Sequence, residues 1–188
     1  MSALVTSLWP SGPIGLAEWE ALPSDAGLRL ECSEGVLVVN PSPRLGHQVA
    51  ALRLARLLQD QLADCLVAPE VDVLLSEVPL TIRTPDLVLI RPELLAGDPV
   101  RLRASDVLMA VEVVSPGSRR TDRITKRSEY AEAGIPLYWV VELESRQITW
   151  HRDPQGEEYR SREVVRDHAV LPAPGGTVRI DLTSLVSR

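Results

Sequence analysis

The sequence predicts an α/β fold in which a mixed β-sheet is flanked by helices. Apolar residues recur every three to four positions from Leu45 to Leu62, which indicates a helix of about five turns. Farther along, the apolar runs 107–114 and 137–141 have the pattern of strands covered on both faces, and the segment between them has helix signals. This order is typical of a strand-helix-strand crossover next to antiparallel strands.

The elements before the long helix are short. Residues 15–22 indicate an amphipathic helix that Pro23 ends. Residues 28–32 alternate between apolar and polar types, Ser33-Glu34-Gly35 is typical of a turn, and residues 36–39 are β-branched and apolar. The pattern therefore predicts a hairpin.

After the long helix, short strand-like runs are separated by Pro or Ser-Glu breaks, and they cover residues 65–68, 71–75, 80–82 and 86–90. Residues 91–105 are predicted to form a loop. Ser118 or Thr121 can cap a helix that reaches Ala133 and ends at Gly134. Further strands are predicted at residues 147–150, 163–165 and 177–180.

The 188 residues suffice for one domain with one substantial core, and we expect a single domain over 1–188. Apolar types make up 45% and charged types 24%, which excludes a disordered chain. An apolar run long enough for a bilayer and a basic leader are both missing, so we expect a cytoplasmic protein without membrane contact. Cys32 and Cys65 lie in apolar contexts, which favours reduced, buried thiols and excludes a cysteine-based zinc site.

The formal charge of −6 excludes a basic surface that wraps nucleic acid, so phosphate binding must be local. Lys126 is the only lysine beside nineteen arginines. The ammonium group of Lys is compact and its pKa can be shifted by the surroundings, whereas the guanidinium group of Arg is wide, planar and permanently charged. Lys126 therefore marks a position where that difference matters, although chance alone also explains a single lysine.

Two carboxylates stand in apolar surroundings. Asp86 follows Pro85 and opens an apolar run, and Glu112 is the only charge in the strand 107–114. An ionised carboxylate in such a place must be paired, neutralised or bound to a cation. On neighbouring strands the two could hold Mg²⁺ or Mn²⁺ through oxygen ligands. The alternative is that Asp86 caps a turn and Glu112 pairs with an arginine.

The predicted helix after residue 118 places Lys126 beside the end of the Glu112 strand, where clefts of α/β sheets open. An ammonium there could hold an attacking water or stabilise charge on a phosphoryl oxygen. The same stretch is locally basic and could contact a phosphate backbone, or it could simply be a solvated helix face. Its arginines are Arg119, Arg120, Arg123 and Arg127.

Taken together, these segments resemble the Uma-type family of predicted restriction endonucleases, in the PD-(D/E)xK nuclease superfamily. The resemblance covers about residues 15–186 and includes the hairpin near Leu30-Glu31 and the helix near His47. The segments that resemble the family motifs are Pro85-Asp86, the run Val111 to Pro116, Asp122 with Lys126, the run Tyr130 to Pro136, and Tyr138-Trp139.

The resemblance implies a restriction endonuclease-like core. It implies that Asp86 and Glu112 are metal ligands, with the Val113 carbonyl as a further ligand. Lys126 would be the catalytic lysine and Glu31 an auxiliary acid. The superfamily lysine usually lies two residues after the acid on the same strand, and here that position is Val114. The resemblance suggests that the lysine has moved to the following helix.

Our leading hypothesis is therefore a Mg²⁺- or Mn²⁺-dependent endonuclease that hydrolyses DNA phosphodiester bonds. One alternative is a nuclease-like fold kept as a binding or assembly module without turnover. Another is a hydrolase of RNA or small phosphoesters with the same site residues. We expect a homodimer, because most oligomers are two-fold symmetric and enzymes that cut duplex DNA commonly pair two sites. His47, at the start of a helix, is interpreted as a surface or partly satisfied residue, and Trp139 and Trp150 as core.

Overall fold

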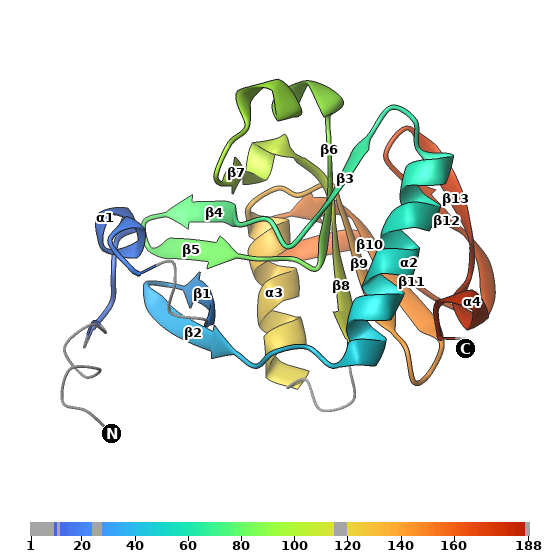
Figure 1. Cartoon of the computed structure of the whole chain (residues 1–188), viewed down its shortest axis with the longest axis horizontal. Coiled ribbons are helices and arrows are strands. Elements are labelled where there is room, and N and C mark those ends of the chain that lie inside the picture. The colour runs from blue at the N-terminus through green and yellow to red at the C-terminus, as the bar shows by residue number, and fades with distance from the viewer. Residues whose placement is uncertain (1–9, 11, 24–27, 115–119, 187–188) are drawn as a thin grey trace.

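A six-stranded mixed sheet forms the centre of the molecule (Figure 1). The computed structural model describes residues 10, 12–23, 28–114 and 120–186, without the side chains of residues 120–123. The strand order is β11-β10-β9-β8-β6-β3, in which β8 and β9 pair in parallel and the other neighbours are antiparallel. The strands are β3 (Leu66–Pro69), β6 (Leu87–Ile90), β8 (Val107–Val114), β9 (Leu137–Glu142), β10 (Gln147–Gln155) and β11 (Glu158–Arg166).

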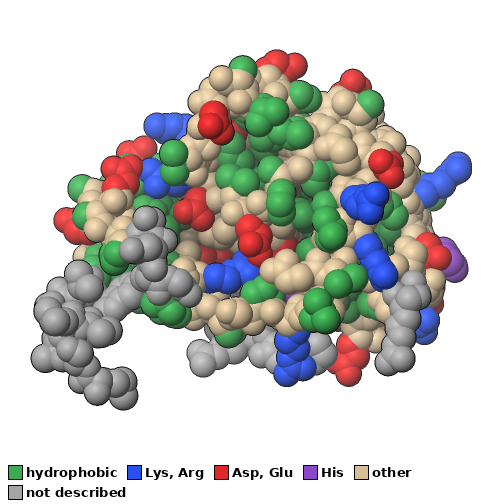
Figure 2. All heavy atoms as spheres, viewed as in Figure 1, with side chains coloured by type: hydrophobic (Ala, Val, Ile, Leu, Met, Phe, Trp, Pro, Cys, Tyr) green, Lys and Arg blue, Asp and Glu red, His purple; other side chains and the backbone are tan. Residues whose placement is uncertain are grey.

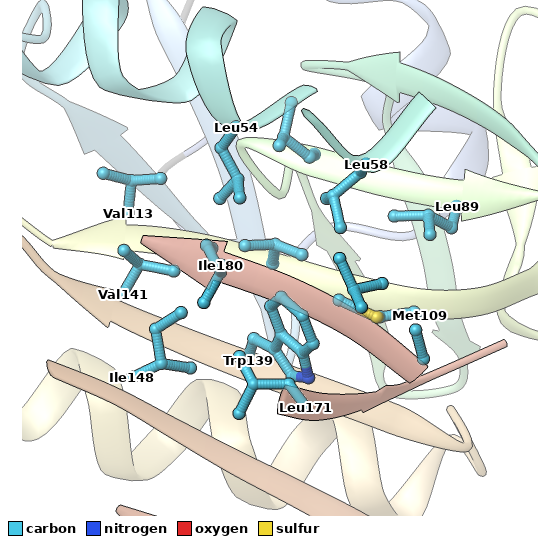
Figure 3. Close-up of a cluster of buried hydrophobic side chains, with 14 of the residues drawn as sticks. Leu54, Leu58, Leu89, Met109, Val113, Trp139, Val141, Ile148, Leu171 and Ile180 are labelled. Atoms are coloured by element: carbon cyan, nitrogen blue, oxygen red, sulfur yellow. The ribbon is translucent and has the colours of Figure 1, made fainter. Parts of the chain in front are cut away.

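Two helices cover this sheet, as the periodicity predicts. Helix α2 (Leu45–Gln61) packs on one face in a core that contains Met109, Val111 and Val113. Helix α3 (Arg120–Glu132) shares a separate core with Ala110 and Val114. Neighbouring residues of a strand point to opposite faces, so β8 supplies both cores from alternate positions. The core under α2 also contains the buried ring of Trp139 (Figure 3).

The N-terminal hairpin and three of the short strands that follow α2 form a second, five-stranded sheet, whereas β3 and β6 join the first. Its order is β2 (Val36–Asn40), β1 (Arg29–Ser33), β5 (Leu80–Arg83), β4 (Val73–Glu77) and β7 (Leu102–Arg103). The chain leaves this sheet after Arg83 and enters the six-stranded sheet at Leu87. Pro85 lies between them and has no backbone N–H to donate, which favours the break. A small core with Cys32 and Ile82 joins this sheet to α1 (Leu16–Glu20).

Several short elements differ from the sequence expectation. The region predicted as a loop at 91–105 contains two 3₁₀ helices, η1 (Pro92–Gly97) and η2 (Ala104–Asp106), as well as β7. A separate hairpin follows β11. It consists of β12 (His168–Ala173), which was not predicted, and β13 (Gly176–Asp181), which contains the strand predicted at 177–180; α4 (Leu182–Val186) comes next. This hairpin packs Leu171, Val178 and Ile180 into the core under α2. The mixed composition of β12 obscures the alternation that would have indicated a strand.

Two expectations from composition can be compared with the structure. Cys32 and Cys65 are buried free thiols, in agreement with the sequence. The described helices include none with the length and apolar character needed to cross a membrane.

Two glutamines of α2 bond backbone groups at strand edges where no neighbouring strand is present. Gln59 donates to the Cys65 carbonyl at 2.9 Å and accepts the Val67 N–H at 3.0 Å, along the edge strand β3. Gln61 makes the same pair of bonds with Arg179 on β13, at 2.8 and 2.9 Å. An open sheet edge leaves unpaired backbone groups, and a side-chain amide can satisfy one donor and one acceptor at once.

We predict that Gln59→Ala lowers the free energy of unfolding by about 1 to 2 kcal/mol, because two hydrogen bonds to β3 are lost. Urea unfolding followed by circular dichroism measures the change. Arg56→Ala, an exposed position on the same helix, is the control and should stay within about 0.5 kcal/mol of the parent protein. Equal losses in both variants would contradict the role of the Gln59 amide.

Candidate active site

Glu112 lies on β8 with its side chain on the face covered by α3. Lys126 Nζ lies 2.8 Å from Glu112 Oε1, and the Tyr130 hydroxyl donates to the same oxygen at 2.8 Å. Lys126 and Tyr130 are four residues apart on α3, so they project from one face of the helix. The only lysine of the chain is therefore paired with the acid of the interior strand.

A second carboxylate holds the same ammonium. Lys126 Nζ lies 3.0 Å from Oε1 of Glu31, which is on β1 and only 2% exposed. Arg83 Nη1 donates to Glu31 Oε2 at 3.0 Å, and the Thr84 N–H donates to Oε1 at 3.1 Å. Lys126 thus links the six-stranded sheet to the five-stranded sheet through buried charges.

Arg83 extends this series of buried ion pairs to α3. Its Nε and Nη2 donate to the two carboxylate oxygens of Glu129 at 2.6 and 2.8 Å, and the Ser33 hydroxyl donates to Glu129 at 2.6 Å. Acids and cations therefore alternate from Glu112 through Lys126 and Glu31 to Arg83 and Glu129. Because Arg83 is itself only 5% exposed, each charge in the series depends on its neighbours for compensation.

Asp86 lies beside Glu112 at the backbone of β8. It is 8% exposed, and its Oδ2 accepts the Val113 N–H at 2.7 Å. The N–H and C=O of one strand residue point to the same side, so the Val113 carbonyl faces the edge that Asp86 occupies. The structure thus places Asp86 next to the residue that follows Glu112, directly before β6, the antiparallel neighbour of β8.

Of the two alternatives for His47, a surface residue or a partly satisfied one, the structure shows a buried and partly satisfied residue. It lies in the first turn of α2, and its Nε2 is 3.2 Å from Asp86 Oδ2. This hydrogen bond is the main cause that raises the pKa of His47, against the opposing effect of burial. Its Nδ1 is buried and has no partner among the described residues. The helical periodicity of α2 places this histidine on the core side, a signal that the sequence interpretation left unused.

The electrostatics of Glu112 and Glu31 differ although both contact Lys126. Burial raises the pKa of Glu112 to about 7; the charge of Lys126 opposes this shift, and Asp86 and Glu31 increase it. Burial also disfavours the ionised form of Glu31, but Lys126 and Arg83 outweigh it and hold the pKa at about 2. The two carboxylates raise the pKa of Lys126, although burial acts in the opposite direction.

A cavity of about 320 Å³ opens beside these groups, and Glu31, Glu112 and Lys126 line it together with Asn40 and Tyr138. Asp86 lines a different, mainly apolar groove of about 380 Å³ beside α2. The predicted site residues therefore come together, but Asp86 approaches from the other side of the β8 backbone.

The oxygen atoms at this point fit a hard divalent cation. Within the described part of the chain, Asp86 Oδ1 and Glu112 Oε2 have no hydrogen-bond partner, and the Val113 carbonyl faces the same edge. The described residues contain no group of three or more His, Cys, Asp or Glu placed to hold a metal. A cation here would therefore need the carbonyl and water besides the two acids, as Mg²⁺ does.

The structure describes only part of the predicted basic stripe. Arg119 lies outside the described residues, and Arg120 and Arg123 are described by their backbone alone. Arg127 faces away from Lys126, into a pocket above β9, β10 and β11. Acidic and basic side chains are mixed on the face seen in Figure 2, in keeping with the charge of −6.

Sequence reasoning missed Arg83, Glu129 and Tyr130 as members of the site. Tyr130 lies one helical turn after Lys126, so the helix period alone could have indicated it. Arg83 and Glu129 are distant in the chain and meet through packing, which leaves no local signal.

Comparisons with known proteins agree with this architecture. One family model, described as "Uma2: Putative restriction endonuclease", matches residues 16–183. No curated protein matches the chain. A solved structure from Anabaena variabilis ATCC 29413, described as "a putative nuclease belonging to DUF820", is similar with a TM-score of 0.74. The identity is 17%, over 93% of this chain and 98% of that chain, so the likeness shows the fold.

We predict that Glu31→Gln removes a pH dependence of stability below pH 4.5. The pKa of Glu31 is about 2 in the folded protein and 4.5 in the reference state. The unfolded chain therefore binds the proton first as the pH falls, and stability present above pH 4.5 is lost towards pH 2. The variant should be less stable at pH 6 by about 2 to 3 kcal/mol, and the difference should shrink towards pH 2.

Urea unfolding between pH 2 and 6 measures this difference. Glu20→Gln is the matched control, because Glu20 forms an exposed ion pair with Arg101 and should change stability by less than about 1 kcal/mol. A Glu31→Gln variant that is destabilised equally at pH 6 and pH 2 would contradict the assignment.

Proposed function

The chain belongs to the Uma2 family of restriction endonuclease-like proteins, and we propose that it is a Mg²⁺-dependent endonuclease that hydrolyses DNA phosphodiester bonds. The observation that carries this proposal is the pairing of the only lysine with the acid of β8, next to the residue that binds Asp86. Two acids and a buried ammonium around one strand residue form an arrangement suited to phosphoryl chemistry.

Asp86, Glu112 and the Val113 carbonyl are the groups that would hold the cation. When bound, Mg²⁺ supplies Lewis-acid polarisation of the phosphate and lowers the pKa of a coordinated water. One oxygen of Asp86 and one of Glu112 have no hydrogen-bond partner in the described part of the chain, which supports this assignment. The raised pKa of Glu112 supports it as well, because a nearby cation would favour the ionised carboxylate.

Lys126 acts on the reacting phosphate or on the attacking water. An ammonium has three N–H donors, and two of them point to Glu112 and Glu31. The third remains for a phosphoryl oxygen or a water in the cavity of about 320 Å³. Its raised pKa keeps Lys126 protonated at neutral pH, so it stabilises negative charge and does not act as a base.

Glu31 and Arg83 position Lys126 without contacting the reacting atoms. Glu31 is tied to Arg83 and to the Thr84 N–H, so its carboxylate has little freedom to follow the lysine. His47 has a similar relation to Asp86, because its Nε2 and the Val113 N–H share one carboxylate oxygen, and the other has no partner among the described residues. Such supporting contacts commonly decide how accurately ligands are held.

We predict that Asp86→Asn and Lys126→Arg each lower Mg²⁺-dependent cleavage of supercoiled plasmid by at least about a hundredfold. Asparagine removes the charge that would hold the cation, and arginine cannot match the compact ammonium. Arg56→Ala, on the exposed side of α2, should cleave like the parent protein. Circular dichroism and thermal unfolding show whether each variant is folded.

Cleavage of RNA or of a small phosphodiester in place of plasmid would overturn the assignment of DNA as substrate. If the protein binds the metal but cleaves neither plasmid DNA, RNA nor a small phosphodiester, a non-catalytic module would be favoured.

We also predict that Mn²⁺ binds the metal-free protein and raises its thermal unfolding temperature. A ligand at a hundred times its Kd adds about 2.7 kcal/mol to the stability of the folded state. Asp86→Asn should abolish the shift, whereas Glu20→Gln should retain it. Isothermal titration calorimetry gives the stoichiometry, and an equal Mn²⁺ response in the Asp86→Asn variant would contradict the proposed ligand.

A further inference from the structure

A second polar cavity lies on the other side of α3, away from Lys126. It has a volume of about 270 Å³ and is formed by one helix and three neighbouring strands, β9, β10 and β11. The residues that line it are Ile124, Arg127, Val140, Glu142, Thr149, His151 and Arg162. Because a water takes up about 30 Å³ in the liquid, the cavity can hold a polyatomic ligand.

The donors in this cavity are not satisfied by the protein. Within the part of the chain that the structure describes, Arg127, Arg162, Thr149 and His151 form no hydrogen bond or ion pair. Arg127 Nε is fully buried without a partner. Thr149 and His151 are 8% and 4% exposed. Buried donors are nearly always bonded, so the unpartnered Arg127 Nε, next to the buried Thr149 and His151, indicates that a ligand completes its bonding. Arg162 is exposed and adds a second guanidinium to the lining.

The charge of the cavity favours an anion. Two guanidinium groups approach the imidazole of His151 closely enough to influence it; burial, then Arg162 and Arg127, lower its pKa to about 4. The ring is therefore neutral at pH 7; it stacks on the ring of Tyr138 and makes a tilted contact with the ring of Tyr159. Glu142 is the acid in the lining, and it already accepts hydrogen bonds from Ser145 and Gln147.

The donors surround the cavity from several elements. Arg127 comes from α3, while His151 and Arg162 are directly paired on β10 and β11. The two guanidinium groups, the Thr149 hydroxyl and the His151 ring N–H together offer several donors. Several donors from different directions match the oxygens of a phosphate group.

The cavity is close to the proposed cleavage site. Glu112, Val140 and Thr149 are neighbours in register on three adjacent strands. With about 4.8 Å between strands, the backbones of Glu112 and Thr149 are roughly 10 Å apart. A nucleic-acid strand rises about 3.4 Å per nucleotide, so this separation corresponds to about three nucleotides.

We propose that the cavity between α3 and strands β9 to β11 is a phosphate-binding site in which Arg127 and Arg162 hold the anion. The phosphate belongs either to a DNA backbone or to a free phosphate compound. The binding of phosphate does not depend on cleavage; only the assignment to a DNA backbone rests on the proposed endonuclease function.

The test titrates inorganic phosphate into the metal-free protein at constant ionic strength, with chloride as the reference anion. The His151 ring signals are followed by nuclear magnetic resonance. Saturable shifts are expected, and Arg162→Gln should weaken phosphate binding at least about tenfold, since a charge-assisted hydrogen bond contributes more than 1.4 kcal/mol. Arg160→Gln is the matched control, because Arg160 lies on the same strand outside the cavity and bonds to Gln155.

Asp86→Asn separates this proposal from the proposed cleavage function. This variant should bind phosphate like the parent protein while it loses cleavage. A short DNA duplex added in the presence of a chelator distinguishes the two sources of the phosphate. Shifts of His151 with DNA that Arg162→Gln weakens identify a backbone phosphate, and shifts with inorganic phosphate alone identify a free one. The absence of phosphate-dependent shifts at His151, or equal affinity in Arg162→Gln, would overturn the proposal.

Discussion

A buried ammonium held between two sheets is the interaction on which the rest of the site depends. Lys126 contacts Glu112 on the six-stranded sheet and Glu31 on the five-stranded sheet, and Arg83 compensates the remaining charge of Glu31. Removing one partner of such a set leaves a charge uncompensated in the interior, which is far more costly than losing an exposed pair. The packing of α3, the relative position of the sheets and the geometry of the site are therefore linked.

Helix α3 separates two polar cavities with different linings. Lys126 faces a cavity in which Glu31 and Glu112 balance Lys126 and Arg83. Its neighbour Arg127 faces the cavity above β10 and β11, whose lining has two arginines and one acid. Consecutive helix residues project about 100° apart, so one helix can serve both sides. On a chain with a net charge of −6, the two guanidinium groups of the second cavity are a local concentration of positive charge.

Asp86 reaches the site differently from the other acids. Its carboxylate is fixed by the Val113 N–H and His47 on the α2 side of β8, while Glu112 projects to the α3 side. Side chains alternate along β8, so Glu112 projects to the α3 side and Val113 to the α2 side, while Asp86 reaches the Val113 backbone from the start of β6. A backbone N–H and its carbonyl lie at the edge between the faces, and the proposed metal site therefore includes the main chain of Val113.

The amino-acid sequence was enough to predict the main helices and the crossover strands, and it marked Lys126 as a candidate site residue. Periodicity and composition are local properties, so α2, β8 and β9 could be predicted closely from them. That the strands divide into separate sheets and that Arg83 compensates Glu31 became visible in the folded structure alone. The same holds for the hydrogen bond between His47 and Asp86. These outcomes depend on contacts between residues far apart in the chain, whose burial and pairing energies no local pattern encodes.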